Sequence, residues 1–281
     1  MQILENISLE KYTTFKMGGI VQTFFFPENV DELMALSKRL TPPIRYIGGG
    51  SNILANDEKV FREVVCLRDF NTEIKNLGNG LFRIGASVRL QRLIKEINEN
   101  GYGGIEYLYS VPGLVGGAVV MNAGRGKKYN QTISDYILEV QIIQEGKIVS
   151  IPKDACEFKH RSSIFKNGNV VIVSVLFKFP EGNREQFNID RQRRIELCRE
   201  KQDMSFPNYG TVFCVANRKI IELYSRFFSS DKKKICFSRK TNNWMLNKGG
   251  TFDDAIKEIE HVKLIHKLLF QKCKEEVIIW K

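Results

Sequence analysis

Short apolar runs alternate with polar and glycine-rich stretches through much of the chain, and their lengths predict strands. A run of about four to eight β-branched, aromatic or other apolar residues between turn-forming residues is typical of a strand. The runs at 137–144 and 170–179 are the longest and give the strongest strand predictions. In chain order, we expect strands at 21–26, 44–47, 64–67, 81–84, 137–144, 170–179 and 277–280.

Apolar residues spaced three and four positions apart predict helices at 30–40 and 90–98, because such a series covers one helical face. Residues 183–202 form a basic helix candidate with few large apolar side chains. A further helix is expected to begin at Thr251, which can cap it, since Asp254 stands three residues on and an apolar face follows.

This mixture of short strands, helices and glycine turns predicts the α+β class. A length of 281 residues is long for one domain and suits two or three. The character of the sequence changes after Pro180, where the basic helix candidate begins. We therefore place one domain boundary near 180 and a softer one near 66.

Composition narrows the class of protein. The chain is 43% apolar, which allows a sizeable core and excludes a disordered protein. Its 43 Lys and Arg residues against 32 Asp and Glu residues give a net charge of +11. That balance favours anionic partners, which include nucleic acid, phosphate groups and acidic substrates. The basic stretches lack interleaved aromatic residues, so nucleic acid is not the expected partner.

The sequence also predicts the cellular compartment of the protein. Its first 15 residues lack the apolar segment of a secretory signal. No stretch approaches the roughly 18 uninterrupted apolar residues of a membrane helix. Six cysteines without Cys-x-x-Cys spacing indicate reduced thiols and no metal site. We therefore expect a cytoplasmic protein without membrane insertion.

A glycine triplet is the first candidate for a binding site. Gly48, Gly49 and Gly50 follow a predicted strand and precede Ser51 and Asn52. Glycines let a backbone approach a phosphate closely and turn N–H groups toward it, and Ser and Asn side chains add donors. The alternative is an ordinary loop between strands. The residues that follow fit neither a Rossmann fingerprint nor a P-loop.

The second candidate is the segment 110–124, in which small residues are dense. Such a segment exposes its backbone to a flat or phosphorylated ligand, and the alternative is a close crossing of a helix and a strand. Two glycine segments in one chain favour a large cofactor that carries a diphosphate.

Three further positions are candidates for chemistry, each with a plain structural alternative. Arg161 could bind an anion, although a single arginine is usually a surface residue. Thr211 follows Gly210, which could present the hydroxyl from a turn or simply form that turn. Glu275 and Glu276 precede the terminal strand, where paired carboxylates are mostly solvated.

Taken together, these segments resemble the UDP-N-acetylenolpyruvoylglucosamine reductase family over nearly the whole chain. The most specific segment is 111–124, Val-Pro-Gly-Leu-Val-Gly-Gly-Ala-Val-Val-Met-Asn-Ala-Gly, which resembles the family's second flavin loop. The spacing, without a long insertion, is similar to the family's shorter subclass. The matching blocks are 12–19, 47–54, 111–124, 160–166, 199–202 with 207–213, and 274–279.

The resemblance implies a two-part FAD-binding module of the vanillyl-alcohol-oxidase (PCMH) type plus a smaller α+β substrate-binding domain. Residues 1–66 would form the first FAD-binding subdomain, with the strand at about 274–281 returning to it. Residues 67–180 would form the second subdomain, and 181–273 the UDP-sugar domain. The implied cofactor-binding residues are Gly48, Gly49, Gly50, Ser51, Asn52, Pro112, Gly113, Gly116, Gly117, Ala118 and Asn122.

The resemblance also implies the chemistry. NADPH would reduce FAD, and the enolpyruvyl UDP-sugar would then accept a hydride and a proton to become UDP-N-acetylmuramate, in peptidoglycan precursor synthesis. Arg161 and Glu276 would hold and polarise the substrate carboxylate, and Thr211 would give the proton. Glu276 would be protonated or paired with Arg161, so its pKa would be perturbed. Lys201, with Arg161, would bind the substrate.

The chain departs from the family pattern at several positions. Thr211 replaces the usual Ser, and its methyl group stiffens the side chain. Cys214 and Val215 replace a common Lys-Asn pair, His160 replaces Tyr, and Thr241 replaces His. The flavin half therefore matches better than the substrate half. Two alternatives stay open: a related FAD oxidoreductase with an altered substrate, and a flavin-binding homologue with weakened catalysis.

Overall fold

The structure, a computed structural model, describes residues 1–41, 43–125, 130–167, 170–230 and 232–281. These residues form two compact units, each built from separate stretches of the chain. Unit 1 consists of Met1–Leu4, Phe24–Gly49 and Glu63–Cys198. Unit 2 consists of Glu5–Thr23, Gly50–Arg62 and Arg199–Lys281.

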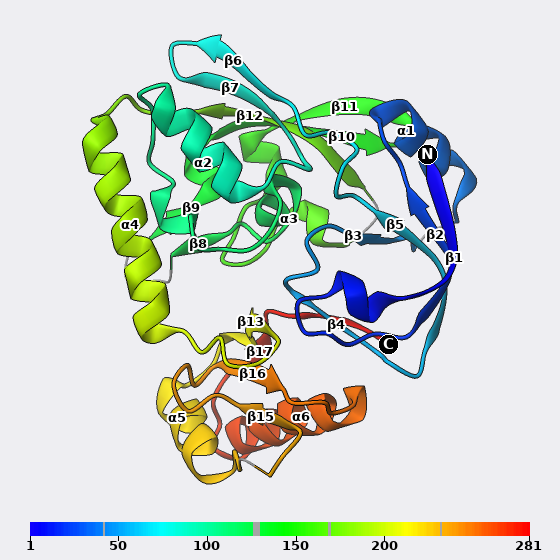
Figure 1. Cartoon of the computed structure of the whole chain (residues 1–281), viewed down its shortest axis with the longest axis vertical. Helices are drawn as coiled ribbons and strands as arrows, with labels where there is room; N and C mark the ends of the chain where they lie inside the picture. Colours follow the sequence, from blue (N-terminus) through cyan, green and yellow to red (C-terminus); the bar gives the residue numbers. More distant parts are fainter. Residues whose placement is uncertain (42, 126–129, 168–169, 231) are drawn as a thin grey trace. The chain divides into compact units, whose positions relative to one another are not determined.

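A five-stranded antiparallel sheet in the order β11-β10-β12-β7-β6 is the centre of unit 1 (Figure 1). Val140 of β10 lies opposite Val175 of β12, and Val175 lies opposite Ile84 of β7. These three side chains are buried, which explains the long apolar runs of the central strands. The strands are β6 Ile74–Gly78, β7 Leu81–Gly85, β10 Ile137–Gln144, β11 Lys147–Pro152 and β12 Val171–Lys178.

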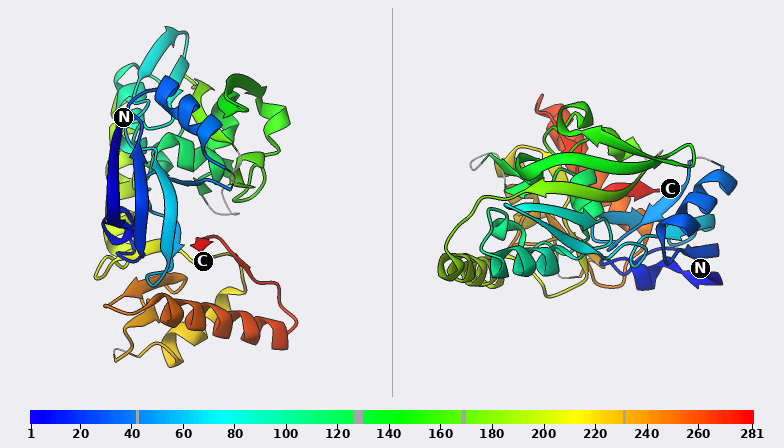
Figure 2. Two further views of the ribbon diagram at one scale, coloured as in Figure 1. Left: turned by 90° about the vertical axis from the view of Figure 1, so that its right-hand side faces the viewer. Right: turned by 90° about the horizontal axis from the view of Figure 1, so that it is seen from above.

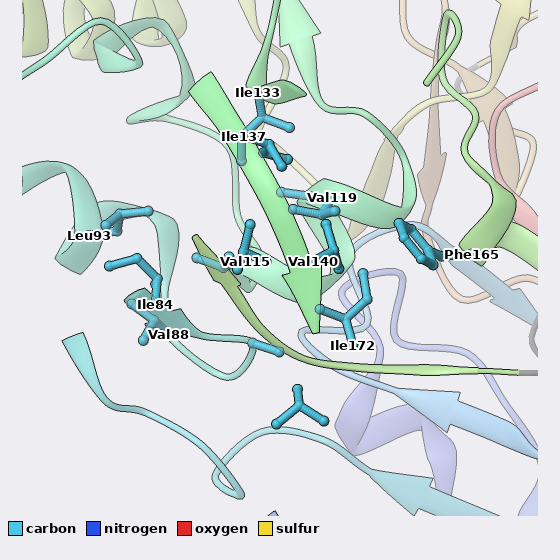
Figure 3. Close-up of a cluster of buried hydrophobic side chains, with 14 of the residues drawn as sticks. Ile84, Val88, Leu93, Val115, Val119, Ile133, Ile137, Val140, Phe165 and Ile172 are labelled. Atoms are coloured by element: carbon cyan, nitrogen blue, oxygen red, sulfur yellow. The ribbon is translucent and has the colours of Figure 1, made fainter. Parts of the chain in front are cut away.

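Helices α2 and α3 contribute buried side chains to the core of unit 1. Helix α2, Leu90–Glu99, buries its leucine and isoleucine face, as its apolar spacing predicts. Helix α3, Val115–Val120, buries Val115 and Val119, which gather with Val140 in the apolar cluster shown in Figure 3. The second glycine-rich segment is therefore anchored from its apolar side.

A second sheet has four strands in the order β1-β2-β5-β3, and β3 runs parallel to β5. Helix α1, Val30–Arg39, follows β2 and is capped by Asn29, whose side chain accepts from the Glu32 N–H. Strand β3 ends at Ile47, directly before the glycine triplet. The strands are β1 Gln2–Ser8, β2 Ile20–Phe26, β3 Arg45–Ile47 and β5 Val60–Cys66.

Unit 2 combines a three-stranded sheet, β13-β16-β15, with two strand pairs, β14-β17 and β18-β4. Helices α5, Arg218–Phe227, and α6, Phe252–Leu268, pack against β15 and against each other (Figure 2). The pair β18-β4 is parallel, with Ile278 opposite Ile53. The strands are β4 Ile53–Ala55, β13 Asn208–Thr211, β14 Phe213–Val215, β15 Ile235–Phe237, β16 Trp244–Asn247, β17 Lys274–Glu275 and β18 Ile278–Trp280.

The remaining elements are the long helix α4 and several short helices and strands. Every residue of α4, Arg184–Lys201, is at least partly exposed, in keeping with its polar sequence. None of the helices in the described ranges is long and apolar enough to cross a membrane. The short elements are η1 Leu9–Tyr12, η2 Glu106–Leu108, η3 Ile133–Tyr136, η4 Lys153–Cys156, η5 Ile164–Asn167, β8 Gly124–Arg125 and β9 Gln131–Thr132.

The α+β class predicted from the sequence is confirmed, and each predicted strand and helix is present with ends shifted by a few residues. Helix α3 was not expected, because its valines and glycines are poor helix formers and its six residues depend on tertiary packing. Strand β4 was also missed, since three residues give too little periodicity to detect.

Candidate functional site

The two glycine-rich segments touch each other in unit 1. A Cβ added to Gly49 would lie 3.2 Å from the Cα of Gly113, and one added to Gly48 would lie 3.2 Å from the side chain of Leu114. The carbonyl of Gly48 accepts a hydrogen bond from Arg68 Nε at 3.0 Å. Larger residues at these positions would push the segments apart, so the glycines allow two backbones to meet.

The glycines of α3 serve different purposes. A Cβ on Gly116 would lie 3.0 Å from Ala86 Cβ, so Gly116 lets the helix pack closely on the chain after β7. A Cβ on Gly117 would meet no atom within 4 Å, and this residue is exposed. Pro112, at the start of the segment, is also exposed, whereas Ala118 is buried. Close packing therefore explains Gly116, and an open backbone surface remains at Gly117.

Arg161 is fixed onto the end of this segment. Its guanidinium donates to the carbonyl of Asn122 at 3.3 Å and to that of Gly124 at 2.7 Å. Lys159 and Ser162 exchange backbone hydrogen bonds of 3.0 and 3.2 Å, which places Arg161 in a tight turn. Its φ of 54° lies in the left-handed region, as does the φ of 42° at Asn122. The arginine turn and the second glycine segment thus form one hydrogen-bonded assembly in unit 1.

Asn122 supports this assembly with its side chain, which is buried. Its amide nitrogen donates to the carbonyl of Lys159 at 3.1 Å, and its amide oxygen accepts from the Ser134 N–H at 3.4 Å. Ser163 Oγ adds a bond of 2.8 Å to the carbonyl of Val120. Asn122 therefore shapes the segment through protein contacts, in addition to any contact with a cofactor.

Tyr107 is a residue that sequence reasoning missed. Among the side chains that the structure describes, Tyr107 Oη and Ser229 Oγ are buried polar atoms without a hydrogen-bond partner. Tyr107 lies on η2, which packs against β8. Burial raises the pKa of Tyr107, and the charge of Arg161 opposes that rise. An unsatisfied buried hydroxyl costs about 1–3 kcal/mol, so a bound group with an acceptor there would be stabilised.

Unit 2 brings Thr211 and Glu276 together. The Glu276 N–H donates to the carbonyl of Val212 at 2.8 Å, and Phe213 lies opposite Glu275 in the β14-β17 pair. Both Thr211 and Glu276 are half-buried. A hydroxyl and a carboxyl from distant parts of the sequence thus lie on adjoining segments, whereas Arg161 belongs to unit 1.

The first glycine loop continues into the same part of unit 2. Asn52 Nδ2 donates to the carbonyl of Glu276 at 3.2 Å, and the Ile278 N–H donates to the carbonyl of Asn52 at 3.0 Å. Gly50 has a φ of 66°, and a Cβ there would lie 2.0 Å from the carbonyl oxygen of Tyr12. Ser51, between them, is half-buried. The loop that was predicted to hold a phosphate also holds the segment that carries Glu276.

The two terminal carboxylates differ in their surroundings. Partial burial of Glu275 raises its pKa, but the hydrogen bond from Lys263, a backbone hydrogen bond and the charges of Lys263 and Lys281 together outweigh that effect, so the pKa lies below its usual value. The distance from Lys263 Nζ to Glu275 Oε1 is 2.8 Å. Glu275 therefore takes part in an ion pair with Lys263 of α6, which gives it a structural role.

Lys201 lies at the end of α4, exposed and ion-paired with its neighbour Glu200. The Thr241 hydroxyl donates to the carbonyl of Lys201 at 2.8 Å, and its Oγ1 accepts from the Asp203 N–H at 2.9 Å. The threonine that replaces the family's usual histidine therefore orders the backbone around Lys201.

These features define the class of protein. Two touching glycine segments, an arginine turn fixed onto one of them and the open backbone at Gly117 fit a cofactor-binding module, and residues 21–151 match the FAD binding domain family. The chain is thus an FAD-binding protein, and the module predicted from the resemblance is confirmed.

The relatives narrow the class further. The UDP-N-acetylenolpyruvoylglucosamine reductase of Petrotoga mobilis is 30% identical over 298 residues, which cover 99% of this chain and 95% of the relative. That of Fervidobacterium nodosum is 31% identical over 288 residues, which cover 98% and 91%. A crystal structure of this enzyme from Thermus caldophilus has the same fold, with a TM-score of 0.79, 22% identity, and coverage of 100% of this chain and 98% of that chain. The chain belongs to the UDP-N-acetylenolpyruvoylglucosamine reductase family, as its motifs indicated.

Proposed function

We propose that the protein is a cytoplasmic FAD-dependent reductase that converts UDP-N-acetylglucosamine enolpyruvate to UDP-N-acetylmuramate with NADPH as hydride donor. This reaction belongs to peptidoglycan precursor synthesis. The relatives named UDP-N-acetylenolpyruvoylglucosamine reductase, which match over nearly their full length, support the proposal. The observation that carries it is the hydrogen bond of 2.8 Å from the Glu276 N–H to the Val212 carbonyl, which holds the backbone of Glu276 against the residue that follows Thr211.

The residues present fit FAD. The open backbone at Gly117 and the unsatisfied hydroxyl of Tyr107 are features that a bound group would use. We propose that backbone amides and side chains of residues 48–52 hold the diphosphate, and that residues 112–118 with Asn122 lie at the ring. The chemistry that FAD supplies when bound is hydride uptake from NADPH and hydride delivery to the enolpyruvyl group.

The chain's own residues would stabilise the charge that this reaction creates. Hydride addition to the carbon distal to the carboxylate builds negative charge on the enolate, which a cation or donor must stabilise. We propose that Arg161 and Glu276 act at the carboxylate, with Glu276 protonated or paired with Arg161, so that it does not repel the substrate. Thr211 would give the proton to the neighbouring carbon. Lys201 would meet the UDP diphosphate.

An anaerobic two-step titration tests the proposal. The purified protein should be yellow, NADPH should bleach it, and the enolpyruvyl UDP-sugar should restore the colour without oxygen. Glu276→Gln should retain FAD and bleaching but recolour at least about a hundredfold more slowly, the usual scale of loss for a catalytic acid or base. Glu275→Gln is the matched control and should recolour at nearly the wild-type rate. A colourless protein that does not take up FAD would overturn the proposal.

A second candidate function is a related FAD oxidoreductase with an altered substrate. The substitution of Cys214 and Val215 for the family's Lys-Asn pair favours it, because both replacements remove polar groups expected near the nucleotide. Bleaching by NADPH without recolouring by the enolpyruvyl UDP-sugar would select this candidate. No bleaching with any hydride donor would instead indicate a flavin-binding homologue that has lost catalysis.

A further inference from the structure

We infer that Thr14 is a positioning residue that links the first glycine loop to the strand presenting Thr211. Its backbone N–H donates to the carbonyl of Gly50 at 3.0 Å. Its hydroxyl donates to the carbonyl of Asn208, the first residue of β13, at 2.7 Å. Thr14 thus holds the loop mainly through its backbone N–H, with a longer contact of 3.5 Å from its hydroxyl, and it holds the strand through its hydroxyl. The inference rests on the proposed function, because it assigns Thr14 to the second half-reaction.

The geometry of β13 makes the Asn208 carbonyl a sensitive point. The Asn208 side chain accepts from the Gly210 N–H at 3.2 Å and donates to the carbonyl of Phe206 at 3.1 Å. Gly210 has a φ of 77°, and the pairing of β13 with β16 is irregular between Asn208 and Thr211. Because regular ladder bonds are interrupted here, the direction of Thr211 depends on how Asn208 is held.

The far side of this strand is tied to the same loop. Val212, next to Thr211, accepts the bond from the Glu276 N–H, and Asn52 holds the Glu276 carbonyl. Hydrogen bonds therefore connect Gly50 to β13 through Thr14, and connect the end of β13 back to Asn52 of the same loop through Glu276. Because the loop is bonded to both segments, it would fix the positions of Thr211, the proposed proton donor, and Glu276 relative to the bound cofactor.

Removal of the hydroxyl should leave the segment around Thr14 in place. The neighbouring Phe15 ring packs on Tyr209 with a centroid distance of 4.6 Å, and its carbonyl accepts from Asn247 Nδ2 at 2.8 Å. Thr13 closes a separate local turn with Met17, through bonds of 2.9 and 3.1 Å. A change of the hydroxyl thus removes the bond of 2.7 Å to Asn208 and a longer contact of 3.5 Å to the Gly50 carbonyl, while the Thr14 N–H keeps its own bond to Gly50.

Thr14→Val tests the inference, since valine keeps the branched shape without the hydroxyl, and Thr14→Ser is the matched control. In Thr14→Val, FAD affinity and the rate of bleaching by NADPH should stay within about twofold of wild type. Recolouring by the enolpyruvyl UDP-sugar should slow about tenfold or more, as group transfer is sensitive to small misplacements. Backbone amides of residues 208–213 should exchange hydrogen faster in the FAD-free protein. Thr14→Ser, which keeps the hydroxyl, should show the wild-type rates of recolouring and of hydrogen exchange.

Equal slowing of bleaching and recolouring, or weaker FAD binding, would overturn the inference and make Thr14 a structural residue. Unchanged recolouring and unchanged hydrogen exchange would overturn it as well. A wild-type protein that does not bleach or recolour would refute the proposed function instead. In that case the exchange measurement decides separately whether Thr14 holds the strand.

Discussion

Arg161 and Asn122 show how single residues shape the candidate site. Both have left-handed backbone conformations, which typically cost about 1–3 kcal/mol for residues other than glycine. The guanidinium of Arg161 donates to the carbonyls of Asn122 and Gly124, and the Asn122 side chain donates to the carbonyl of Lys159. These bonds offset the strain and fix the guanidinium against the second glycine segment, where the proposed reaction needs a rigid cation.

Gly117 offers a direct test of cofactor binding at the residue scale. A Cβ at this position meets no protein atom within 4 Å, and alanine is a better helix former than glycine by about 0.5–1 kcal/mol. Gly117→Ala should therefore leave the FAD-free protein as stable as wild type or slightly more stable. FAD affinity should fall at least tenfold, by about 1.4 kcal/mol, if the cofactor lies against this backbone. Thermal unfolding and flavin fluorescence titration measure the two effects.

Gly116→Ala provides the contrasting variant. Its Cβ would lie 3.0 Å from Ala86 Cβ, so this change should destabilise the protein itself. Wild-type FAD affinity in Gly117→Ala would contradict the assignment of this surface to the cofactor.

Thr211 is the second residue-scale test. Thr211→Ala should leave bleaching by NADPH intact and slow recolouring about a hundredfold or more, because it removes the proposed general acid. Thr211→Ser keeps the hydroxyl and should recolour at the wild-type rate or faster. Stopped-flow absorbance measures both steps. Equal loss in both steps for Thr211→Ala would make Thr211 a structural residue.

At the scale of elements, helix α6 has a cap that can be tested. Thr251 Oγ1 accepts from the Asp254 N–H at 3.3 Å, and Asp254 accepts from the Thr251 N–H at 3.1 Å. Thr251→Ala should lower the free energy of unfolding by about 1 kcal/mol, and Thr251→Ser should largely restore it. Urea denaturation of the three proteins measures the difference.

The same cap predicts a pH dependence. The hydrogen bond from the Thr251 N–H lowers the pKa of Asp254 from its ordinary value of 3.8. Because the folded state favours the ionised Asp254 carboxylate, this group stabilises the fold fully above pH 3.8. That contribution is lost as the pH falls through the pKa of Asp254 in the folded state. The stability difference between wild type and Asp254→Asn should therefore shrink in acid. A difference that is constant with pH would contradict this role.

The longest apolar runs and several amphipathic helices were predicted from the sequence, whereas helix α5, despite its apolar face, and helix α3, which is set by tertiary packing, were not. The apolar run at 137–144 coincides with β10, and the cap at Thr251 begins α6 as expected. Helix α3 consists of valine, alanine and glycine, and it forms because Val115 and Val119 are buried in the core of unit 1. Local sequence carries no pattern for such a helix.

At the scale of the whole molecule, motifs select the residues of the candidate site, but they do not reveal how these residues are connected. The glycine segments, Arg161, Thr211 and Glu276 stand out as residue types in recognisable blocks. The bond from Asn52 to the Glu276 carbonyl spans 224 positions of sequence and ends on a backbone atom. Backbone acceptors exist at every residue, so no sequence pattern marks this one.

The composition of unit 2 gives a prediction at the same scale. Its apolar core combines Phe15, Met17 and Leu54 with residues of 199–281, and β4 supplies the partner strand of β18. The isolated fragment 199–281 should therefore lack cooperative thermal unfolding and near-ultraviolet circular dichroism, both of which the intact chain should show. A sharp unfolding transition of the fragment would show instead that it folds without the N-terminal stretches.

This interleaving has a consequence for biosynthesis. On the ribosome, the stretch around Leu54 emerges well before its parallel neighbour β18 is translated. The apolar side chains of β4 must therefore stay without this partner strand until the ribosome has translated β18. A message that ends prematurely would yield a product whose first glycine loop never acquires its partner strand.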